Sequence, residues 1–327
     1  AANPNAKIRS RALAAINVFI NEPIAHTCRE NIDAILGRLV QLTSDSDDDV
    51  RRYVCRAFAL LADGMPDILL PHMQGIVDYT LSQQRNKNNP ELALDAAEFI
   101  FESSNTPKLR DALGQFLPNL VPVLLDSMIY SEDDQARLEG DDDDADEEDE
   151  AKDIKPVFAD AKQKGSTAAS GTSTPQTNGQ TKPANGYGYE DDDELSEGEI
   201  DEDEDYGVDP EDEWNLRKCS AASLDSIATH YGAPVFEVTL PWLMENLQHQ
   251  EWPNREAAVL ALGAIGPGCI DAIQQHLPKL VPYMITLLND EQPVVRQITC
   301  WALSRFAGWA SALDGDGKHQ FFEPMMD

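Results

Sequence analysis

Closely spaced carboxylates are the side chains of this sequence that could do chemistry. Most of them lie in two blocks, residues 139–150 (EGDDDDADEEDE) and residues 190–205 (EDDDELSEGEIDEDED). Carboxylates at this density repel one another and attract cationic surfaces, so they favour electrostatic binding of a basic protein partner. The candidate binding residues are Asp141, Asp142, Asp143, Asp144, Glu147, Glu148, Asp191, Asp192, Asp193, Glu194, Asp201, Glu202, Asp203, Glu204 and Asp205.

The sequence contains no pattern typical of a catalytic site. HExxH, P-loop and GxSxG motifs are absent, and the six His and five Cys residues are scattered. Asp314-Gly315-Asp316-Gly317 matches the opening of a calcium-binding loop. However, Lys318 stands at the next ligand position and no Glu closes the loop, so an ordinary turn is favoured. We therefore predict a protein that is not an enzyme and that requires no cofactor or metal.

Most of the negative charge belongs to one segment. Residues 131–212 carry about −24 of the formal net charge of −34, with 30 Asp and Glu against 6 Lys and Arg. Such acidity repels the phosphate backbone, so nucleic acid is excluded as the expected partner. No apolar run reaches the roughly 18 residues of a membrane span, which argues against membrane insertion. The five scattered Cys residues favour reduced, mostly buried thiols in an intracellular protein.

The composition of residues 131–212 predicts a disordered, extended acidic loop. Its two acidic blocks flank a Gly-, Ser-, Thr- and Pro-rich middle that offers little apolar surface to bury. The flanking regions, residues 1–130 and 213–327, are predicted to be folded. The chain begins without Met and stops at FFEPMMD, a stretch typical of a helix start, which favours an internal part of a longer protein.

Outside the loop, the hydrophobic periodicity is helical. Val50, Val54, Ala57, Phe58 and Leu61 recur at three- and four-residue intervals, as the buried face of a helix requires. The second helix of a predicted pair opens near an apolar residue that is followed by Arg, as at Ile8-Arg9, Val50-Arg51 and Val295-Arg296, or with an equivalent of that opening. We call these the B helices.

The openings of the B helices recur at a nearly constant spacing. Ile8, Val50 and Leu92 are 42 residues apart, and Asn254 and Val295 are 41 apart. Helix pairs with this period are typical of HEAT and armadillo repeats, which bury their apolar faces by stacking on their neighbours. We therefore predict an all-α, HEAT-repeat superhelical solenoid of about six repeats.

The first helix of each pair, the A helix, is predicted from Leu-Pro pairs. Proline is tolerated at a helix start because its missing N–H would have no intrahelical partner there. The pairs are Leu70-Pro71, Leu117-Pro118, Leu240-Pro241 and Leu277-Pro278. The sequence distance from the Leu of the A helix to the opening of the next B helix is 22 residues after Leu70 and 18 after Leu277. After Leu117 it is 99 residues. The acidic loop is therefore predicted to interrupt the turn between the two helices of one repeat.

Four segments make the sequence similar to a known family. They are WNLRKCSAA (214–222), LGAI (262–265), LPKLVP (277–282) and VRQITCWALSR (295–305). Together with a long acidic loop inside one repeat, they resemble the transportin, or karyopherin beta-2, family of nuclear import receptors in the importin-beta superfamily. The resemblance extends over essentially the whole chain outside the loop. The Gly/Ser/Thr-rich centre of the loop matches no motif of that family.

The resemblance implies a carrier that shuttles between cytoplasm and nucleus through the nuclear pore and contacts nucleoporins. In that family, GTP-bound Ran binds the N-terminal arch of the superhelix, and cargo with a proline-tyrosine nuclear localisation signal binds the C-terminal arch. The acidic loop contacts Ran and helps to expel cargo. The fifteen carboxylates named above are thereby implied as Ran-binding and cargo-release residues. Most of the signal-binding surface is implied to lie beyond Asp327.

Two other functions are compatible with the residues alone. A HEAT scaffold subunit of an enzyme complex, such as a phosphatase, would use the loop as a linker. An acidic chaperone would use it to shield histones or ribosomal proteins.

Tryptophans outside the acidic blocks have two interpretations. They are candidates for peptide pockets, but packing between repeats is favoured, above all for Trp242 and Trp301. The full set is Trp214, Trp242, Trp252, Trp301 and Trp309.

Charged residues near the starts of the B helices also have two interpretations. Asp49, Arg51, Arg255 and Arg296 are candidates for contacts with a partner. A ladder of polar contacts between neighbouring B helices is the favoured alternative.

Overall fold

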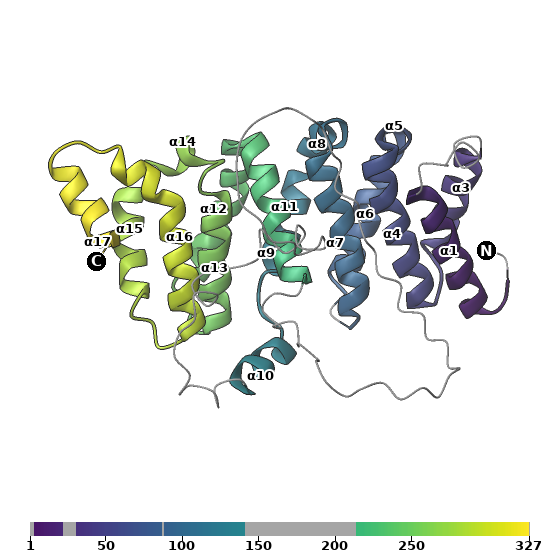
Figure 1. Ribbon diagram of the computed structural model, residues 1–327, viewed down its shortest axis with the longest axis horizontal. Coiled ribbons are helices and arrows are strands. Elements are labelled where there is room, and N and C mark those ends of the chain that lie inside the picture. The colour runs from purple at the N-terminus through teal and green to yellow at the C-terminus, as the bar shows by residue number, and fades with distance from the viewer. Residues whose placement is uncertain (1–2, 22–30, 87, 141–213, 327) are drawn as a thin grey trace, which may run out of the picture. The chain divides into compact units, whose positions relative to one another are not determined.

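Helices form all the regular structure of the computed structural model in the residues that it describes, 3–21, 31–86, 88–140 and 214–326 (Figure 1). This confirms the all-α prediction for the described part of the chain. The fifteen carboxylates predicted as site residues lie outside the described residues, as does Cys28. The helices belong to one compact unit, residues 1–156 and 215–327.

The B helices follow one another through this unit. They are α1 (Ala6–Asn21), α4 (Asp48–Gly64), α7 (Pro90–Asn105), α11 (Leu216–Tyr231), α13 (Trp252–Ile265) and α16 (Pro293–Ser311). Each packs against the next one in this order, and Figure 1 shows them side by side along the unit. This is the stacking expected of HEAT repeats.

An A helix precedes and packs against each B helix from α4 onward. The A helices are α3 (Ile32–Leu42), α6 (Met73–Gln84), α9 (Leu117–Asp126), α12 (Ala233–Asn246) and α15 (Leu277–Leu287). Short helical segments lead into three of them, namely α5 (Pro66–Leu69) with the 3₁₀ turn η1 (Leu70–His72), α8 (Pro107–Leu113) with η2 (Gly114–Phe116), and α14 (Ile270–Ile273). After α16 come a π-helical segment, η5 (Lys318–Phe322), and α17 (Glu323–Met326).

The Leu-Pro prediction is correct for three A helices and wrong for the fourth. Leu117 and Leu277 are the first residues of α9 and α15, and Leu70 begins the 3₁₀ turn before α6. Pro241, however, lies inside α12, which continues unbroken from Ala233. Like Pro122 in α9 and Pro282 in α15, Pro241 removes one backbone hydrogen bond from the interior of a helix that continues through it.

The core forms between helix pairs. Val50, Val54, Ala57, Phe58 and Leu61 of α4 are all buried, which confirms the predicted helical face. The ring of Phe58 makes edge-to-face contacts with one aromatic ring of α6 and one of α7, each at 6.3 Å between centroids. Such pairs stabilise beyond the area that they bury.

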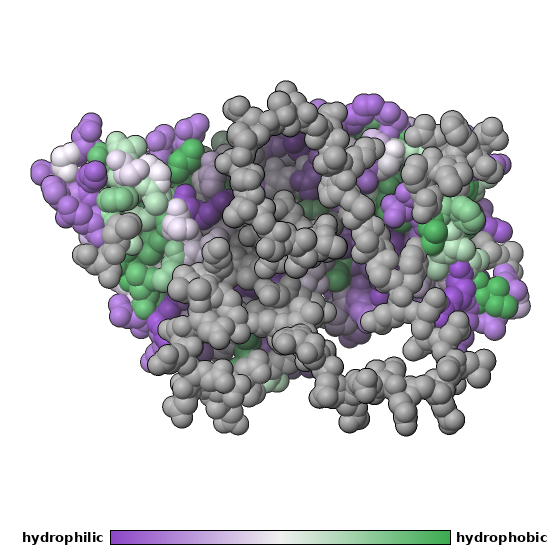
Figure 2. Space-filling view, viewed as in Figure 1, coloured by the Kyte–Doolittle hydropathy of each residue, from purple (hydrophilic) through white to green (hydrophobic). Residues whose placement is uncertain are grey.

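The α1 helix departs from the predicted pattern. Val50 and Leu92 are fully buried, but Ile8, at the equivalent position of α1, is 52 % exposed, and Phe19 of the same helix is 63 % exposed. The reason is that α1 packs against α4, and no second described B helix covers its other side. Figure 2 shows apolar surface at the end of the view where α1 and α3 lie.

The acidic insert leaves the stack uninterrupted. α9 and α11, which flank it, pack against each other, and α11 also packs on α7. The amide of Gln84 in α6 donates hydrogen bonds to hydroxyls on both sides of the insert, to Ser127 just after α9 (3.1 Å) and to Ser220 in α11 (3.2 Å). The insert therefore lies within one helix pair, as predicted.

The first residues of the predicted loop are helical. Glu132–Gly140 form α10, so the prediction of a disordered loop from residue 131 is wrong at its start. A capping box explains this helix. The Ser131 hydroxyl accepts from the Asp134 N–H at 3.1 Å, and the Asp134 carboxylate accepts from the Ser131 N–H at 3.1 Å. Acidic residues in the first turn also complement the helix dipole.

One glycine permits close stacking of α13 and α16. The indole of Trp301 lies directly over Gly263, where an added Cβ would stand 2.9 Å from Cε3 of the ring and closer still to Cζ3. Real Cβ atoms do not approach other heavy atoms so closely. Only glycine fits at this position without movement of α16.

We expect Gly263→Ala to lower the free energy of unfolding by about 1–3 kcal/mol, because the methyl group overpacks the interface. Urea denaturation followed by circular dichroism measures this. The matched control is Gly37→Ala in the middle of α3, where an added Cβ meets nothing within 4 Å. That change should raise stability by up to about 1 kcal/mol through helix propensity. Equal effects of the two substitutions would contradict the packing argument.

Candidate protein-binding surface

Arginine occurs in the first turn of five B helices, as the fourth residue of four of them and as the second residue of α11. The residues are Arg9, Arg51, Arg217, Arg255 and Arg296. Three of them, Arg9, Arg217 and Arg255, bind a carboxylate that belongs to the next repeat. We call this set the ladder arginines.

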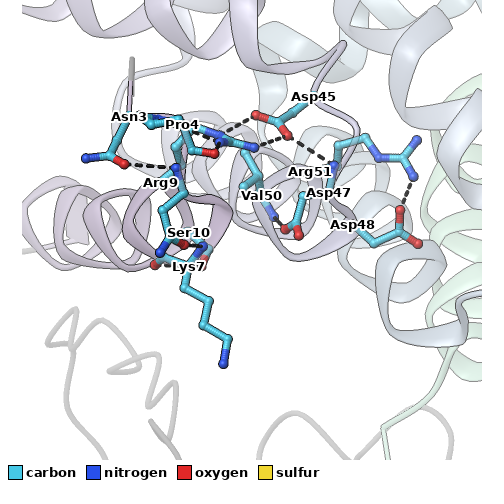
Figure 3. Close-up of polar contacts among 11 residues, drawn as sticks. Asn3, Pro4, Lys7, Arg9, Ser10, Asp45, Asp47, Asp48, Val50 and Arg51 are labelled. Atoms are coloured by element: carbon cyan, nitrogen blue, oxygen red, sulfur yellow. Dashed lines mark hydrogen bonds and ion pairs between the residues drawn. The ribbon is translucent and has the colours of Figure 1, made fainter.

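Arg9 shows the contacts of a ladder arginine most fully (Figure 3). Its Nε and Nη2 atoms donate to the two carboxylate oxygens of Asp45, each at 2.7 Å. Its Nη1 atom donates to the carbonyls of Asn3 (2.9 Å) and Pro4 (3.1 Å). One guanidinium thus ties the start of its own helix to the turn before α4. Two-point binding of a carboxylate fixes both distance and direction.

Arg255 repeats this geometry in a later repeat. Nε and Nη2 bind the carboxylate of Asp290 at 3.0 and 2.9 Å, and Nη1 donates to the carbonyls of His249 (3.0 Å) and Gln250 (2.7 Å). Arg296 donates to the carbonyls of Asp290 and Glu291, at the same sequence offsets. The ladder interpretation of Arg255 is therefore confirmed, and Arg296 closes its own turn.

The α4 helix uses a neighbouring position for the same purpose. Arg52 and Arg56 both bind the buried carboxylate of Asp95 in α7, with Nε distances of 3.0 and 2.8 Å. Arg51 instead pairs with Asp48 of its own helix. Asp49, predicted as a partner of this set, is exposed. An ionic connection between α4 and α7 thus remains, but its arginines are Arg52 and Arg56, one residue and just over one helical turn after Arg51.

The carboxylates of the ladder have lowered pKa values. For Asp45, the hydrogen bonds from Arg9 outweigh burial and hold the pKa below the ordinary 3.8. For Asp290, burial acts in the opposite direction, but the hydrogen bonds from Arg255 and from the Gln292 amide together outweigh it, so its pKa is also lowered. Each carboxylate therefore stabilises the fold in its ionised form.

A second cluster extends over three consecutive B helices. Arg305 of α16 donates from Nε to the carbonyl of Gly263 in α13 (3.1 Å) and from Nη2 to Asp225 in α11 (3.0 Å). Its guanidinium also lies 5.6 Å from the ring centroid of Trp301. We call Trp301, Arg305, Gly263 and Asp225 the three-helix cluster.

The three-helix cluster is partly accessible. Trp301 is half-buried, and the side chains of Arg305 and Asp225 are 29 % and 41 % exposed. Burial raises the pKa of Asp225 although Arg305 opposes the shift. An aromatic face, a cation and an anion thus share one accessible surface, which is typical of sites that bind peptide segments. The sequence did not indicate this cluster, because Asp225 and Arg305 are 80 positions apart.

Two of the remaining tryptophans pack against aromatic rings. Trp242 donates from its indole N–H to Asp126 at 3.3 Å. Trp252 lies 5.5 Å from the Tyr130 ring, and Trp309 lies 5.4 Å from Phe321, between centroids. Trp214 is half-buried. Trp242 thus contacts the preceding repeat through a hydrogen bond, and its packing role stays a prediction, whereas Trp301 both packs on Gly263 and presents part of its ring.

The described residues offer no other chemical centre. No group of three or more His, Cys, Asp or Glu among them is arranged to hold a metal ion. Cys55, Cys219 and Cys269 are buried free thiols, and burial raises the pKa of Cys269 to about 11. Cys300 is exposed, so the prediction of mostly buried thiols is confirmed for three of the four described Cys residues. In the part of the chain that the structure describes, no helix is long and apolar enough to span a membrane.

We expect Asp290→Asn to lower the free energy of unfolding at pH 7 by about 1–3 kcal/mol, because it removes a charged partner of Arg255. Because the folded pKa of Asp290 is lowered, its contribution is complete above pH 3.8 and is lost as the pH falls through the folded value. The difference in the free energy of unfolding between Asp290→Asn and the unmodified protein should therefore be smaller at acidic pH. Urea denaturation at pH 7 and pH 3 measures it, with Asp316→Asn at an exposed position as the control. A difference that is the same at both pH values would contradict this assignment.

Comparison with known proteins agrees with the architecture. A HEAT-like repeat model matches residues 252–306. Among solved structures, Kap121p bound to RanGTP matches with a TM-score of 0.56 and 20% identity, covering 93% of this chain and 25% of that chain. A structure of Kap95p with RanGDP matches with a TM-score of 0.59 and 18% identity, covering 94% and 29%. At these identities the likeness shows the fold.

Sequence relatives are more specific. The chain is 38% identical over 327 residues to importin subunit beta-2 of Schizosaccharomyces pombe, covering 100% of this chain and 35% of that protein. It is 38% identical over 323 residues to transportin-1 of Mus musculus (98% and 33%) and 35% identical to transportin of Dictyostelium discoideum (95% and 35%). The chain thus spans about a third of the length of these relatives. Because the identity extends over the whole chain, the chain belongs to the transportin (importin beta-2) family.

Proposed function

We propose that this chain is part of a nuclear import receptor that binds the localisation signals of cargo and releases them when GTP-bound Ran binds. The observation that carries the proposal is the chain-wide identity of 35–38% to transportins and importin beta-2. Fold neighbours include Kap121p bound to RanGTP and Kap121p bound to Nup53p. Such a receptor works by stoichiometric binding rather than catalysis, and it shuttles between cytoplasm and nucleus in contact with nucleoporins.

The three-helix cluster is the described surface that best fits a cargo signal of the proline-tyrosine type. The accessible part of the Trp301 ring offers a flat apolar face for a proline or tyrosine ring. Arg305 and Asp225 stand beside it and can hydrogen-bond the backbone and polar groups of an extended segment. Because the cluster draws on α11, α13 and α16, an extended peptide can follow the B helices across three repeats.

The acidic insert supplies the proposed means of release. Its fifteen candidate carboxylates, Asp141 to Asp144 and the others named above, are tethered to the same repeat stack. Tethering gives them a high effective concentration near the B helices, so they compete with a basic cargo segment. They also attract a basic surface of Ran over a Debye length, about 8 Å at physiological salt. Ran shifts the competition toward release only if it binds more tightly to the state in which the insert occupies the cargo surface.

Nucleotide-selective binding tests the receptor proposal. We expect the full-length protein to bind Ran locked on GTP at least about tenfold more tightly than Ran on GDP, a free-energy difference of about 1.4 kcal/mol. Biolayer interferometry with the two Ran forms measures it. A scaffold subunit or an acidic chaperone predicts equal binding of both forms, and that outcome would rule out the import receptor.

Substitution of Trp301 tests the cargo surface. We expect Trp301→Ala in the full-length protein to weaken binding of a labelled proline-tyrosine signal peptide by about 10- to 100-fold, as loss of a central aromatic anchor does. Fluorescence anisotropy measures the affinity. The control is Trp309→Ala on the same helix, whose ring packs on Phe321. Thermal melts check that both variants are folded. Unchanged peptide affinity in a folded Trp301→Ala protein would contradict the assignment of the cargo site to the three-helix cluster.

A further inference from the structure

Four side chains surround the point where the acidic insert leaves and rejoins the stack. They are Tyr130, just before α10, Arg217 in the first turn of α11, and Trp252 and Glu256 of α13. We call them, together with the carbonyl of Met128, the root cluster. All of its members lie within the described residues on either side of the insert.

Arg217 is the centre of the root cluster. Its Nε atom donates to the carbonyl of Met128 at 3.1 Å, across 89 positions of sequence. Its Nη2 atom pairs with Glu256 of the next repeat, and its guanidinium lies 4.3 Å from the centroid of the Tyr130 ring. Tyr130 in turn packs on Trp252 at 5.5 Å. One side chain therefore contacts the chain before the insert, the chain after it and the following helix pair.

The other ladder arginines explain this arrangement. In Arg9 and Arg255, Nη1 donates to two carbonyls that lie five and six residues earlier, just before the helix that carries the arginine. In the interrupted repeat, the Met128 carbonyl at the end of α9 takes this part, although the insert separates it from α11. The arginine that closes a short turn elsewhere thus holds together the two ends of the insert.

The root cluster also reaches α10 and the three-helix cluster. Gln135 of α10 donates to the Tyr130 carbonyl at 3.1 Å, so Tyr130 links α10 to Arg217. Arg217 and Asp225 are eight positions apart on α11, about 12 Å at 1.5 Å per residue. Glu256 and Gly263 are similarly related on α13. The same two helices carry the root of the insert and the surface proposed for cargo.

We propose that Arg217 is a positioning residue, which ties the described segments on either side of the acidic insert, residues 128–130 and the start of α11, to α13 and thereby couples the insert to the repeats that carry the three-helix cluster. This rests on the proposed function and deepens it, because the effective concentration of a tethered competitor depends on where its tether begins. Arg217 itself touches neither Ran nor cargo in this scheme. Its guanidinium is 15 % exposed and its partner Glu256 is 2 % exposed, so the anchor is protected from water.

The test compares Arg217→Gln with Arg255→Gln in the full-length protein. Both remove a ladder arginine, but only the first removes the anchor of the insert. We expect amide hydrogen exchange in α10 to accelerate about tenfold or more in Arg217→Gln, because local opening costs less when the Tyr130 contact is lost. Arg255→Gln should leave α10 unchanged. Equal acceleration by both substitutions, or by neither, overturns the proposal.

A second variant guards against general unfolding. Tyr130→Leu leaves the Arg217–Glu256 pair in place and removes the ring between Arg217 and Trp252. It should accelerate exchange in α10 in the same direction, with thermal melts that remain cooperative. Unchanged exchange in Tyr130→Leu contradicts the linking role of the ring.

A functional readout separates this proposal from the receptor function itself. In Arg217→Gln, GTP-bound Ran should weaken binding of the signal peptide by a factor at least about threefold smaller than in the unmodified protein. If Ran and the signal peptide bind neither the unmodified protein nor Arg217→Gln, the proposed receptor function is wrong. The hydrogen-exchange result still tests the anchoring role of Arg217 in that case. If release is unchanged although α10 exchanges faster, the coupling of the insert through Arg217 is overturned.

Discussion

In the residues that the structure describes, each helix pair completes the burial of its apolar face against a neighbouring pair, and the rest of the structure depends on this constraint. The face of α4 that carries Phe58 is completed by α6 and α7, which belong to the following repeat. Burial of apolar surface is strong but non-directional. Arg9 and Arg255 add direction, because a guanidinium that binds both oxygens of one carboxylate permits a single relative position. The apolar faces hold the stack together, and the ladder sets its register.

The same constraint places binding surfaces between repeats. Asp225, Gly263 and Arg305 come from three helices and meet only because α16 passes closely over α13. The close approach depends on the missing side chain of Gly263 beneath the Trp301 ring. A surface assembled in this way responds to small changes in stacking angle. Such an arrangement fits the proposed import receptor, which both holds and releases cargo.

The local periodicity of the sequence predicted the fold well, and long-range contacts escaped it. The face of α4 from Val50 to Leu61 and the interruption between α9 and α11 followed from spacing alone. Pro241 misled the prediction, because a helix can continue through proline when the surrounding packing supports it. Neither the bond from Arg217 to Met128 nor that from Arg305 to Asp225 was predictable. Their partners are separated by 89 and 80 positions: pairing of α9 with α11 inside one repeat brings the first two together, and stacking of repeats brings the second two together.

The hydrogen bond between Arg217 and the Met128 carbonyl has a consequence for how this family can vary. Because side chains hold both ends of the interrupted turn, the stability of the helix stack depends little on the length of the chain between them. The entropic cost of closing a flexible loop rises slowly, by about 0.6 kcal/mol for each doubling of its length. Residues could therefore be added to or lost from the insert with little effect on the fold. The charge and reach of the insert can change independently of the scaffold that carries it.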